Sequence, residues 1–301
     1  MSMEQLSSFG RRGFAVFLAV TILATASFGA TQRMAAVQTV PHDFDCLLKS
    51  GHIQGACCSE QGIYLSHSLG VEKIGWDGRL VKHIDVPGHL GDSAYANGKV
   101  YGAFVVRNPK DRVGGKPGLV RVWDENLNQL AEAWYDEPLD GIVVLGDTVY
   151  VGVDKWGTKP HAMCCVKRLG LDLADRGNVD IDLGYWIRFG VQTMATDGTS
   201  LFFGNYGASA DKGNPSRYNC TRLTPDLRVV GNMKFFCSEG FCLVPQSVSK
   251  REDSVFLAVR AMGGNMQGWR EDPVNNPPRI QINFYEFKDD KFASITTDFK
   301  N

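Results

Sequence analysis

The sequence lacks a second long hydrophobic run and any excess of charge of one sign. Beyond residue 30 no apolar stretch reaches membrane-spanning length, so we expect no membrane span in the mature chain. Lysine and arginine total 32 against 33 aspartate and glutamate, for a formal net charge of −1. No global field therefore attracts nucleic acid, and we expect no nucleic-acid partner. Helical periodicity is also missing beyond the N-terminal segment, which argues against a helical domain.

Several catalytic motifs are missing as well. The sequence has no Gly-x-Ser-x-Gly elbow, no Walker A loop and no CxxC or Cys-His zinc spacing. Serine-elbow hydrolysis, P-loop nucleotide binding and a cysteine zinc site therefore have no support, and the sequence assigns no metal ligand. What remains is an ordinary globular composition, 44% hydrophobic and 22% charged over 301 residues.

The N-terminal segment has the order of a secretory signal. Arg11 and Arg12 precede an apolar run from Phe14 to Ala24, and small residues follow it. This order predicts a signal peptide over residues 1–30 and a secreted or periplasmic protein, with an N-terminal anchor as the alternative. The arginine pair also resembles a twin-arginine signal without its usual Ser or Thr, so the export route stays open.

Eight cysteines in an exported chain predict disulfide bonds, because thiols pair in an oxidising compartment. The spacing of Cys237 and Cys242 suits a local loop disulfide. Neighbouring residues of a strand point to opposite faces, so the two members of Cys57-Cys58 and of Cys164-Cys165 should have separate partners.

An internal repeat is the clearest pattern in the chain. Five segments each combine a short apolar strand, a turn with Gly or Asp, and a second strand that carries an aromatic residue. They are Gly55–Ser66, Asp92–Ala103, Gly141–Gly152, Thr193–Gly204 and Phe241–Ala258, with the aromatics Tyr64, Tyr101, Tyr150, Phe202 and Phe256. Asn-Gly and Asp-Gly turns between apolar runs predict β-hairpins, because their turn type needs positive φ.

Second hairpins follow after variable loops, as in 119–131 and 280–296. Four strands in each repeat of roughly 40 to 55 residues is typical of propeller blades. The chain thus resembles the secreted five-bladed β-propellers, a group with glycoside hydrolases, lectin-like binders and a nucleotidase. The resemblance covers nearly all of the mature chain as a repeat pattern only. It implies an all-β, five-bladed propeller over residues 40–301, with four antiparallel strands per blade. Ring closure stays open between an outer strand at 44–48 and a tether through Cys46.

The repeat also predicts which face carries function. Loops after the aromatic strands are long, whereas the hairpin turns are short, and long loops on a rigid scaffold usually carry the site. The residues that start each blade should point toward the axis on that face. These residues are His52, Gln54, His89, Asp92, Asp140, Arg188, Gln192 and Glu239. The alternative for the aspartates is turn capping or binding of backbone amides, and for the histidines a structural role.

The long loops add aromatic and basic side chains. Trp156, Tyr206 and Trp269 offer flat surfaces for sugar rings, and Arg260 belongs to a loop set in which basic residues outnumber acidic ones. A positive cleft favours anionic ligands such as an anionic glycan or a nucleotide, and the expected partner is a carbohydrate. The alternative is that these loop charges are only solvated.

Two functions are consistent with these residues. In a carbohydrate-active enzyme, Glu239 would act as the acid and Asp92 or Asp140 as the base or nucleophile of a glycoside hydrolase. A polysaccharide lyase would instead use His52 or His89 as the base and Arg188 or Gln192 to neutralise a uronate. The alternative is a non-catalytic propeller that binds a glycan or partner. In that case a calcium ion could be bound by the oxygen-rich set Asp92, Asp140, Gln192 and Glu239.

Overall fold

The computed structural model describes residues 53–68, 70–76, 78–154, 161–207, 220–262 and 279–295. All described residues belong to a single compact unit. The segments 1–30 and 44–48, on which the signal peptide and one mode of ring closure were predicted, lie outside the described residues. Among those residues, no helix has the length and apolar character needed to cross a bilayer.

The described residues form the predicted all-β propeller of five blades. Blade 1 contains β1 (Ile53–Ser59), β2 (Gly62–His67), β3 (Gly70–Ile74) and β4 (Leu80–Asp85). Blade 2 contains β5 (His89–Ala96), β6 (Lys99–Val105), β7 (Gly118–Asp124) and β8 (Gln129–Tyr135). Blade 3 contains β9 (Leu139–Leu145), β10 (Thr148–Val153), β11 (His161–Gly170) and the first part of β12 (Asp175–Thr196).

Blade 4 contains the second part of β12, then β13 (Leu201–Gly207), β14 (Cys220–Leu223) and β15 (Val229–Met233). Blade 5 contains β16 (Phe241–Leu243), β17 (Ser254–Met262), β18 (Arg279–Lys288) and β19 (Lys291–Ser294). The short helices η1 (Pro109–Asp111) and α2 (Gln246–Ser249) lie in connections. Strand order within every blade follows the sequence, so each blade is a local antiparallel meander.

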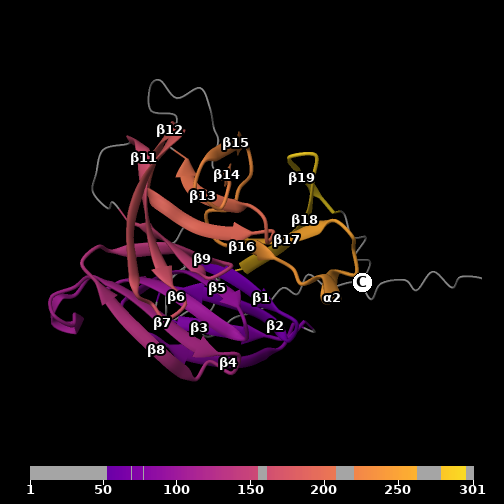
Figure 1. Cartoon of the computed structure of the whole chain (residues 1–301). Helices are drawn as coiled ribbons and strands as arrows, with labels where there is room; N and C mark the ends of the chain where they lie inside the picture. Colours follow the sequence, from indigo (N-terminus) through magenta and orange to yellow (C-terminus); the bar gives the residue numbers. More distant parts are fainter. Residues whose placement is uncertain are drawn as a thin grey trace, which may run out of the picture. The chain divides into compact units, whose positions relative to one another are not determined.

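The long strand β12 joins two blades (Figure 1). Its residues 175–187 pair with β11, and its residues 187–196 pair with β13. Blades 3 and 4 therefore form one continuous sheet of seven strands. This sharing of one strand by two blades was not predicted. The apolar repeat marks where the first strand of blade 4 begins, but it does not show that the last strand of blade 3 continues into that strand.

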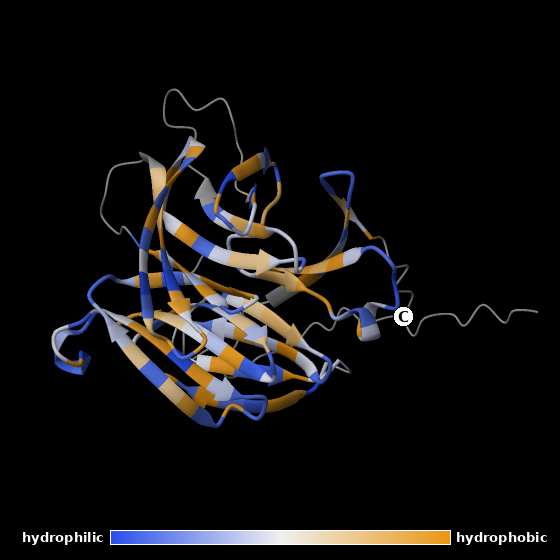
Figure 2. Cartoon of the chain, in the orientation of Figure 1, coloured by the Kyte–Doolittle hydropathy of each residue, from blue (hydrophilic) through white to orange (hydrophobic). Residues whose placement is uncertain are grey.

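Burial decreases from the first strand of a blade to the fourth. Every residue of β1 is buried, whereas β4 and β8 are mostly exposed or half-buried. Hydrophilic residues accordingly interrupt the outer strands in Figure 2. The repeated aromatics lie on the second strands and are all buried, as expected for the part of a blade that is covered on both faces. The turn at Asn97-Gly98 has the predicted positive φ at both residues, 52° and 72°.

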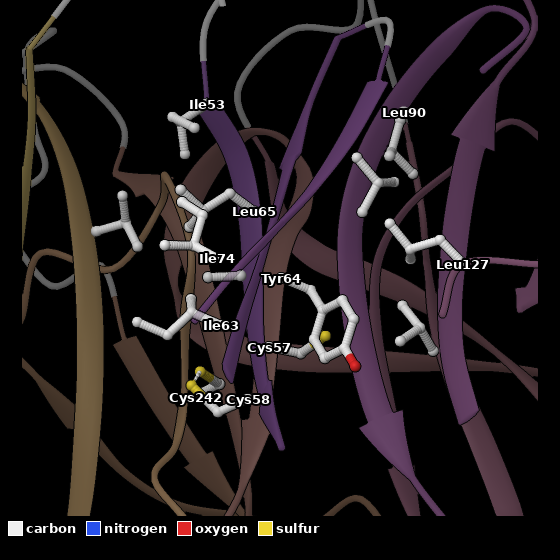
Figure 3. Packing of buried hydrophobic residues seen from close by; sticks show 14 of the residues in the cluster. Ile53, Cys57, Cys58, Ile63, Tyr64, Leu65, Ile74, Leu90, Leu127 and Cys242 are labelled. Carbon is white, nitrogen blue, oxygen red and sulfur yellow. Dashed lines mark hydrogen bonds between the residues drawn. The ribbon is translucent and has the colours of Figure 1, made fainter. Parts of the chain in front are cut away.

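Apolar side chains fill the spaces between neighbouring blades. In Figure 3, Ile63 and Leu65 point to one side of blade 1, while Tyr64 points to the other side, toward Leu90 and Leu127. The same cluster contains Leu257 and Val259 of β17. The first and last blades thus pack against each other, and this contact closes the ring within the described residues.

Glycines in the inner strands let neighbouring blades approach closely at the axis. A Cβ atom at Gly55 of blade 1 would overlap Asp92 Oδ1 of blade 2 and lie 2.6 Å from the Asp92 Cα. A Cβ at Gly91 of blade 2 would in the same way overlap Asp140 Oδ1 of blade 3 and lie 3.0 Å from its Cα. A side chain at either position would push two blades apart.

Gly55→Ala should therefore destabilise the propeller, by about 1–3 kcal/mol of unfolding free energy, because the inserted methyl group meets backbone as well as side-chain atoms. The matched control is Gly231→Ala in β15, where nothing lies within 4 Å of the added Cβ. That control should stay within about 0.5 kcal/mol of the unmodified chain. Denaturant unfolding checks both, and equal effects of the two substitutions would contradict close packing at the axis.

Candidate functional site

The predicted blade-start residues that the structure describes lie at or near the beginning of the inner strands. Gln54 and Asp140 are the second residues of β1 and β9, His89 is the first residue of β5, and Glu239 precedes β16. Gln54 is buried, and His89 and Glu239 are half-buried. We call this end of the inner strands the loop face, and the opposite end, with the hairpin turns at 60–61 and 97–98, the turn face.

Asp92 joins the inner strands of several blades. Its side chain is fully buried, and its Oδ2 accepts the Met194 N–H of blade 4 at 2.7 Å and the Ile142 N–H of blade 3 at 3.4 Å. Burial raises the Asp92 pKa well above its ordinary value, and the backbone N–H groups of Met194, Ser93, Ile142 and Ala56 oppose that rise. Asp92 thus makes the backbone-amide contacts that were the structural alternative for it.

Asp140 lies in a different electrostatic environment. It is 1% exposed, and burial raises its pKa well above the ordinary value. The neighbouring carboxyl groups of Asp154 and Asp92 raise the pKa further, while the Gln192 amide and the Arg107 guanidinium lower it. Although Gln192 is close, no donor among the described residues has full hydrogen-bond geometry to either Asp140 oxygen.

The structure therefore brings Asp92, Asp140 and Gln192 close together. Repulsion between buried carboxylates favours retention of a proton, which is the state that a general acid needs at neutral pH. The carboxyl groups of the predicted calcium set, those of Asp92, Asp140 and Glu239, do not converge on one point as the ligands of a single ion would. Among the described residues, the one group of three His, Cys, Asp or Glu side chains that does so is in blade 1.

Two neighbours of Asp140 were not identified as site residues from the sequence. Asp154 directly follows β10 and is 3% exposed, and Arg107 lies two residues after β6. In the sequence, both residues stand out only as charges of the long loops. Their position just past the aromatic strand of a blade was the available signal, because that strand ends at the loop face.

Six other predicted residues lie wholly or partly outside the described part of the chain. His52, Trp156 and Trp269 lie outside the described residues. The backbones of Arg188, Tyr206 and Arg260 belong to β12, β13 and β17, but their side chains lie outside the description.

A cavity of about 210 Å³ lies at the turn face. All five inner strands or their ends line it, with Cys57, Ser93, Val143, Met194 and Cys242 as representatives. The lining is mainly apolar, and the carboxyl groups of Asp92 and Asp140 do not contribute to it. This cavity was not predicted, because the short turns indicated that function belongs to the loop face.

Comparisons with known proteins support the propeller fold and identify no family. No protein-family model and no curated protein sequence matches the chain. Glutaminyl cyclase from Myxococcus xanthus is similar in structure, with a TM-score of 0.52 and 12% sequence identity over 86% of this chain and 96% of that one. At this identity the likeness shows the propeller fold alone.

Two more distant structures illustrate the range of propeller proteins. One is a GH43 β-xylosidase/α-arabinofuranosidase from a compost microbial metagenome, solved with xylotriose, with a TM-score of 0.48 and 12% identity over 85% of this chain and 97% of that one. The other is BamB from Moraxella catarrhalis, with a TM-score of 0.36 and 11% identity over 50% of this chain and 39% of that one. Neither likeness is close enough to carry a functional conclusion.

The raised pKa of Asp140 predicts a pH dependence of stability. The folded chain holds a proton that the unfolded chain releases above about pH 3.9. The contribution of Asp140 is therefore fully present below that pH, and it is lost as pH rises through the folded-state pKa. The unmodified chain loses this contribution as pH rises, whereas the Asp140→Asn variant has no carboxyl group there to titrate. The unfolding free energy of the variant minus that of the unmodified chain should therefore be larger at pH 7.5 than at pH 4.5. Denaturant unfolding at both pH values measures this change.

The matched control is Asp180→Asn, which replaces an exposed aspartate on β12 and should show no such trend. A trend shared by both variants, or absent from Asp140→Asn, would contradict the assignment.

Proposed function

We propose that this chain is an exported carbohydrate-active enzyme, a glycoside hydrolase or a polysaccharide lyase, that works at the axial end of the loop face. One observation carries the proposal: Asp140 is a buried carboxyl group with a raised pKa beside the second carboxyl group of Asp154. Hydrolysis of a glycosidic bond uses such a pair, in which one carboxylic acid donates a proton and the other stabilises charge or activates water.

Within this proposal, the roles differ from those predicted from the sequence. Asp140 is the proton donor, because its environment favours the protonated form. Asp154 is the second carboxylate, and Asp92 positions the inner strands through its bonds to Ile142 and Met194. Glu239, the acid in the sequence hypothesis, precedes β16 and is half-buried, whereas Asp140 is fully buried beside a second carboxyl group.

Arg107 extends the proposal to anionic substrates. Its guanidinium acts on the Asp140 carboxyl group electrostatically from the loop after β6. A positive group at this position suits a uronate carboxylate, as the lyase variant requires, with His89 as the candidate base.

A non-catalytic propeller that binds a glycan or partner is the second candidate. It is favoured by the amide contacts of Asp92, which are those of a residue that holds strands together. On this alternative, Asp140 would also serve only the packing of blades 2 and 3.

A turnover assay of the exported chain against neutral and anionic polysaccharides separates these functions. New reducing ends indicate hydrolysis, and reducing ends with absorbance from an unsaturated uronate indicate a lyase. Asp140→Asn should lower kcat by about 100- to 10,000-fold while glycan binding survives, because a general acid contributes that much. Asp180→Asn should retain full turnover. Binding without turnover would reject the enzyme proposal and favour the second candidate. Turnover that survives Asp140→Asn would reject the role of Asp140 as the proton donor.

Export to an oxidising compartment is part of the same proposal, and the structure suggests the disulfide pairs. The Sγ atoms of Cys58 and Cys242 lie 3.0 Å apart, between the inner strands of blades 1 and 5 (Figure 3). Cys237 contacts Cys220 instead of Cys242. We therefore propose these two pairs in place of the local Cys237–Cys242 pair that the spacing suits, because each thiol faces a cysteine from another segment.

Peptide mapping of the exported protein without reduction should find a Cys58 peptide linked to a Cys242 peptide, and a Cys220 peptide linked to a Cys237 peptide. The first bond would span 184 residues of chain and join the two ends of the ring. A covalent link of this kind stabilises by about 2–5 kcal/mol. Recovery of a Cys237–Cys242 link, or of unmodified thiols at Cys58 and Cys242, would contradict this pairing.

A further inference from the structure

Three ionisable side chains meet on one face of blade 1, away from the axial carboxyl groups. They are His67 on β2, Glu72 on β3 and His83 on β4. Glu72 pairs directly with His83 across two strands, and His67 pairs with Gly70, two residues before Glu72. Because residues two apart in a strand point to the same side, all three side chains project from the same face.

The burial of this group has no visible compensation. The side chains of His67 and Glu72 are 0% exposed, and that of His83 is 26% exposed. Both ring nitrogens of His67, both carboxylate oxygens of Glu72 and Nδ1 of His83 lack a hydrogen-bond partner within the described residues. A buried carboxylate without hydrogen bonds is costly unless a cation neutralises it.

The spacing of the ligand atoms matches a shared metal ion. Glu72 Oε1 lies 3.4 Å from His67 Nε2 and 3.6 Å from His83 Nδ1. These separations exceed a normal N–H···O hydrogen bond. Zinc-to-ligand bonds of 2.0–2.1 Å at tetrahedral angles place neighbouring ligand atoms about 3.3 Å apart. All three ligand atoms lie within 4.8 Å of one another.

A neighbouring carboxylate orients one of the histidines. His83 Nε2 lies 3.2 Å from Asp85 Oδ1. In the neutral tautomer that donates its Nε2 proton to Asp85, Nδ1 directs a lone pair toward Glu72, and a metal ion between the two groups makes that approach favourable. Metal-bound histidines usually have such a carboxylate on their second nitrogen.

Gly70 leaves room for the two rings. A Cβ at this position would lie 2.5 Å from His67 Cε1 and 2.9 Å from His83 Cε1. The rings are stacked with their centroids 5.7 Å apart and their planes 10° from parallel. The absence of a side chain at Gly70 thus leaves room for both imidazoles beside Glu72.

We propose that His67, Glu72 and His83 bind one divalent transition-metal ion of the zinc class. Two imidazoles and one carboxylate suit such an ion better than calcium or magnesium, which prefer oxygen ligands. Three protein ligands leave a fourth position open to water, and the partial exposure of His83 gives access to it. The site is independent of the axial carboxyl groups and of the function proposed for them.

The experiment uses the exported full chain, treated with a chelator and then titrated with Co²⁺ and Zn²⁺. Tetrahedral Co²⁺ should give intense visible absorption at one ion per chain, and Zn²⁺ should displace it and raise the Tm. Glu72→Gln should weaken binding by more than about 100-fold, because it removes the anionic ligand. The spectrum should lack thiolate-to-cobalt bands, which separates this site from the buried cysteines.

Asp85→Asn serves as the second variant, because this residue is 91% exposed and its replacement should leave the fold intact. It should weaken Co²⁺ binding by about 10- to 100-fold. The matched control is Asp180→Asn, an exposed aspartate on the outer part of β12, and its affinity should not change. Absence of Co²⁺ binding would overturn the proposal and leave a histidine–carboxylate ion pair. Binding that neither Glu72→Gln nor Asp85→Asn weakens would also overturn it.

Discussion

The packing of the inner strands depends on one buried carboxyl group, that of Asp92. It belongs to blade 2, accepts backbone N–H groups from blades 3 and 4, and lies against Gly55 of blade 1. These hydrogen bonds link residues that are 50 and 102 positions from Asp92 in the sequence. Such bonds are stronger when the acceptor is ionised, whereas burial favours the protonated form. Asp92 and the glycine it lies against therefore belong to the closest contact between the blades at the axis.

The propeller separates polar and apolar packing. Apolar clusters lie between blades and are continuous around the ring, from blades 1 and 2 to the contact of blade 5 with blade 1. Polar groups gather near the loop face at the axis, where Asp140, Asp154 and Gln192 meet. The turn face carries an apolar cavity instead. The two ends of the inner strands therefore differ in chemistry, with polar groups at the loop face and an apolar cavity at the turn face.

Buried charge is compensated differently at the two polar clusters. At the axis, backbone N–H groups and retained protons offset the burial of Asp92 and Asp140. In blade 1, Glu72 has no comparable donor within the described residues, and two imidazoles surround it. A metal ion supplies there what amides and protons supply at the axis. The same rule, that a buried charge needs a partner, thus leads to two different sites.

The sequence by itself determined the blade architecture and most of the axial residues. Strand alternation, Asn97-Gly98 and the aromatic of each second strand are local patterns, so a four-strand meander can be recognised without any long-range contact. The sequence also nominated Asp92 and Asp140, because a blade begins where its loop ends. The tertiary structure alone decided the partners: Met194 for Asp92, Cys58 for Cys242, and His67 with His83 around Glu72. Those contacts depend on strand register and on the angle between blades. A shift of one residue in the pairing of β3 with β4 would turn Glu72 to the opposite face, so its contact with the two imidazoles rests on the register that the folded blade adopts.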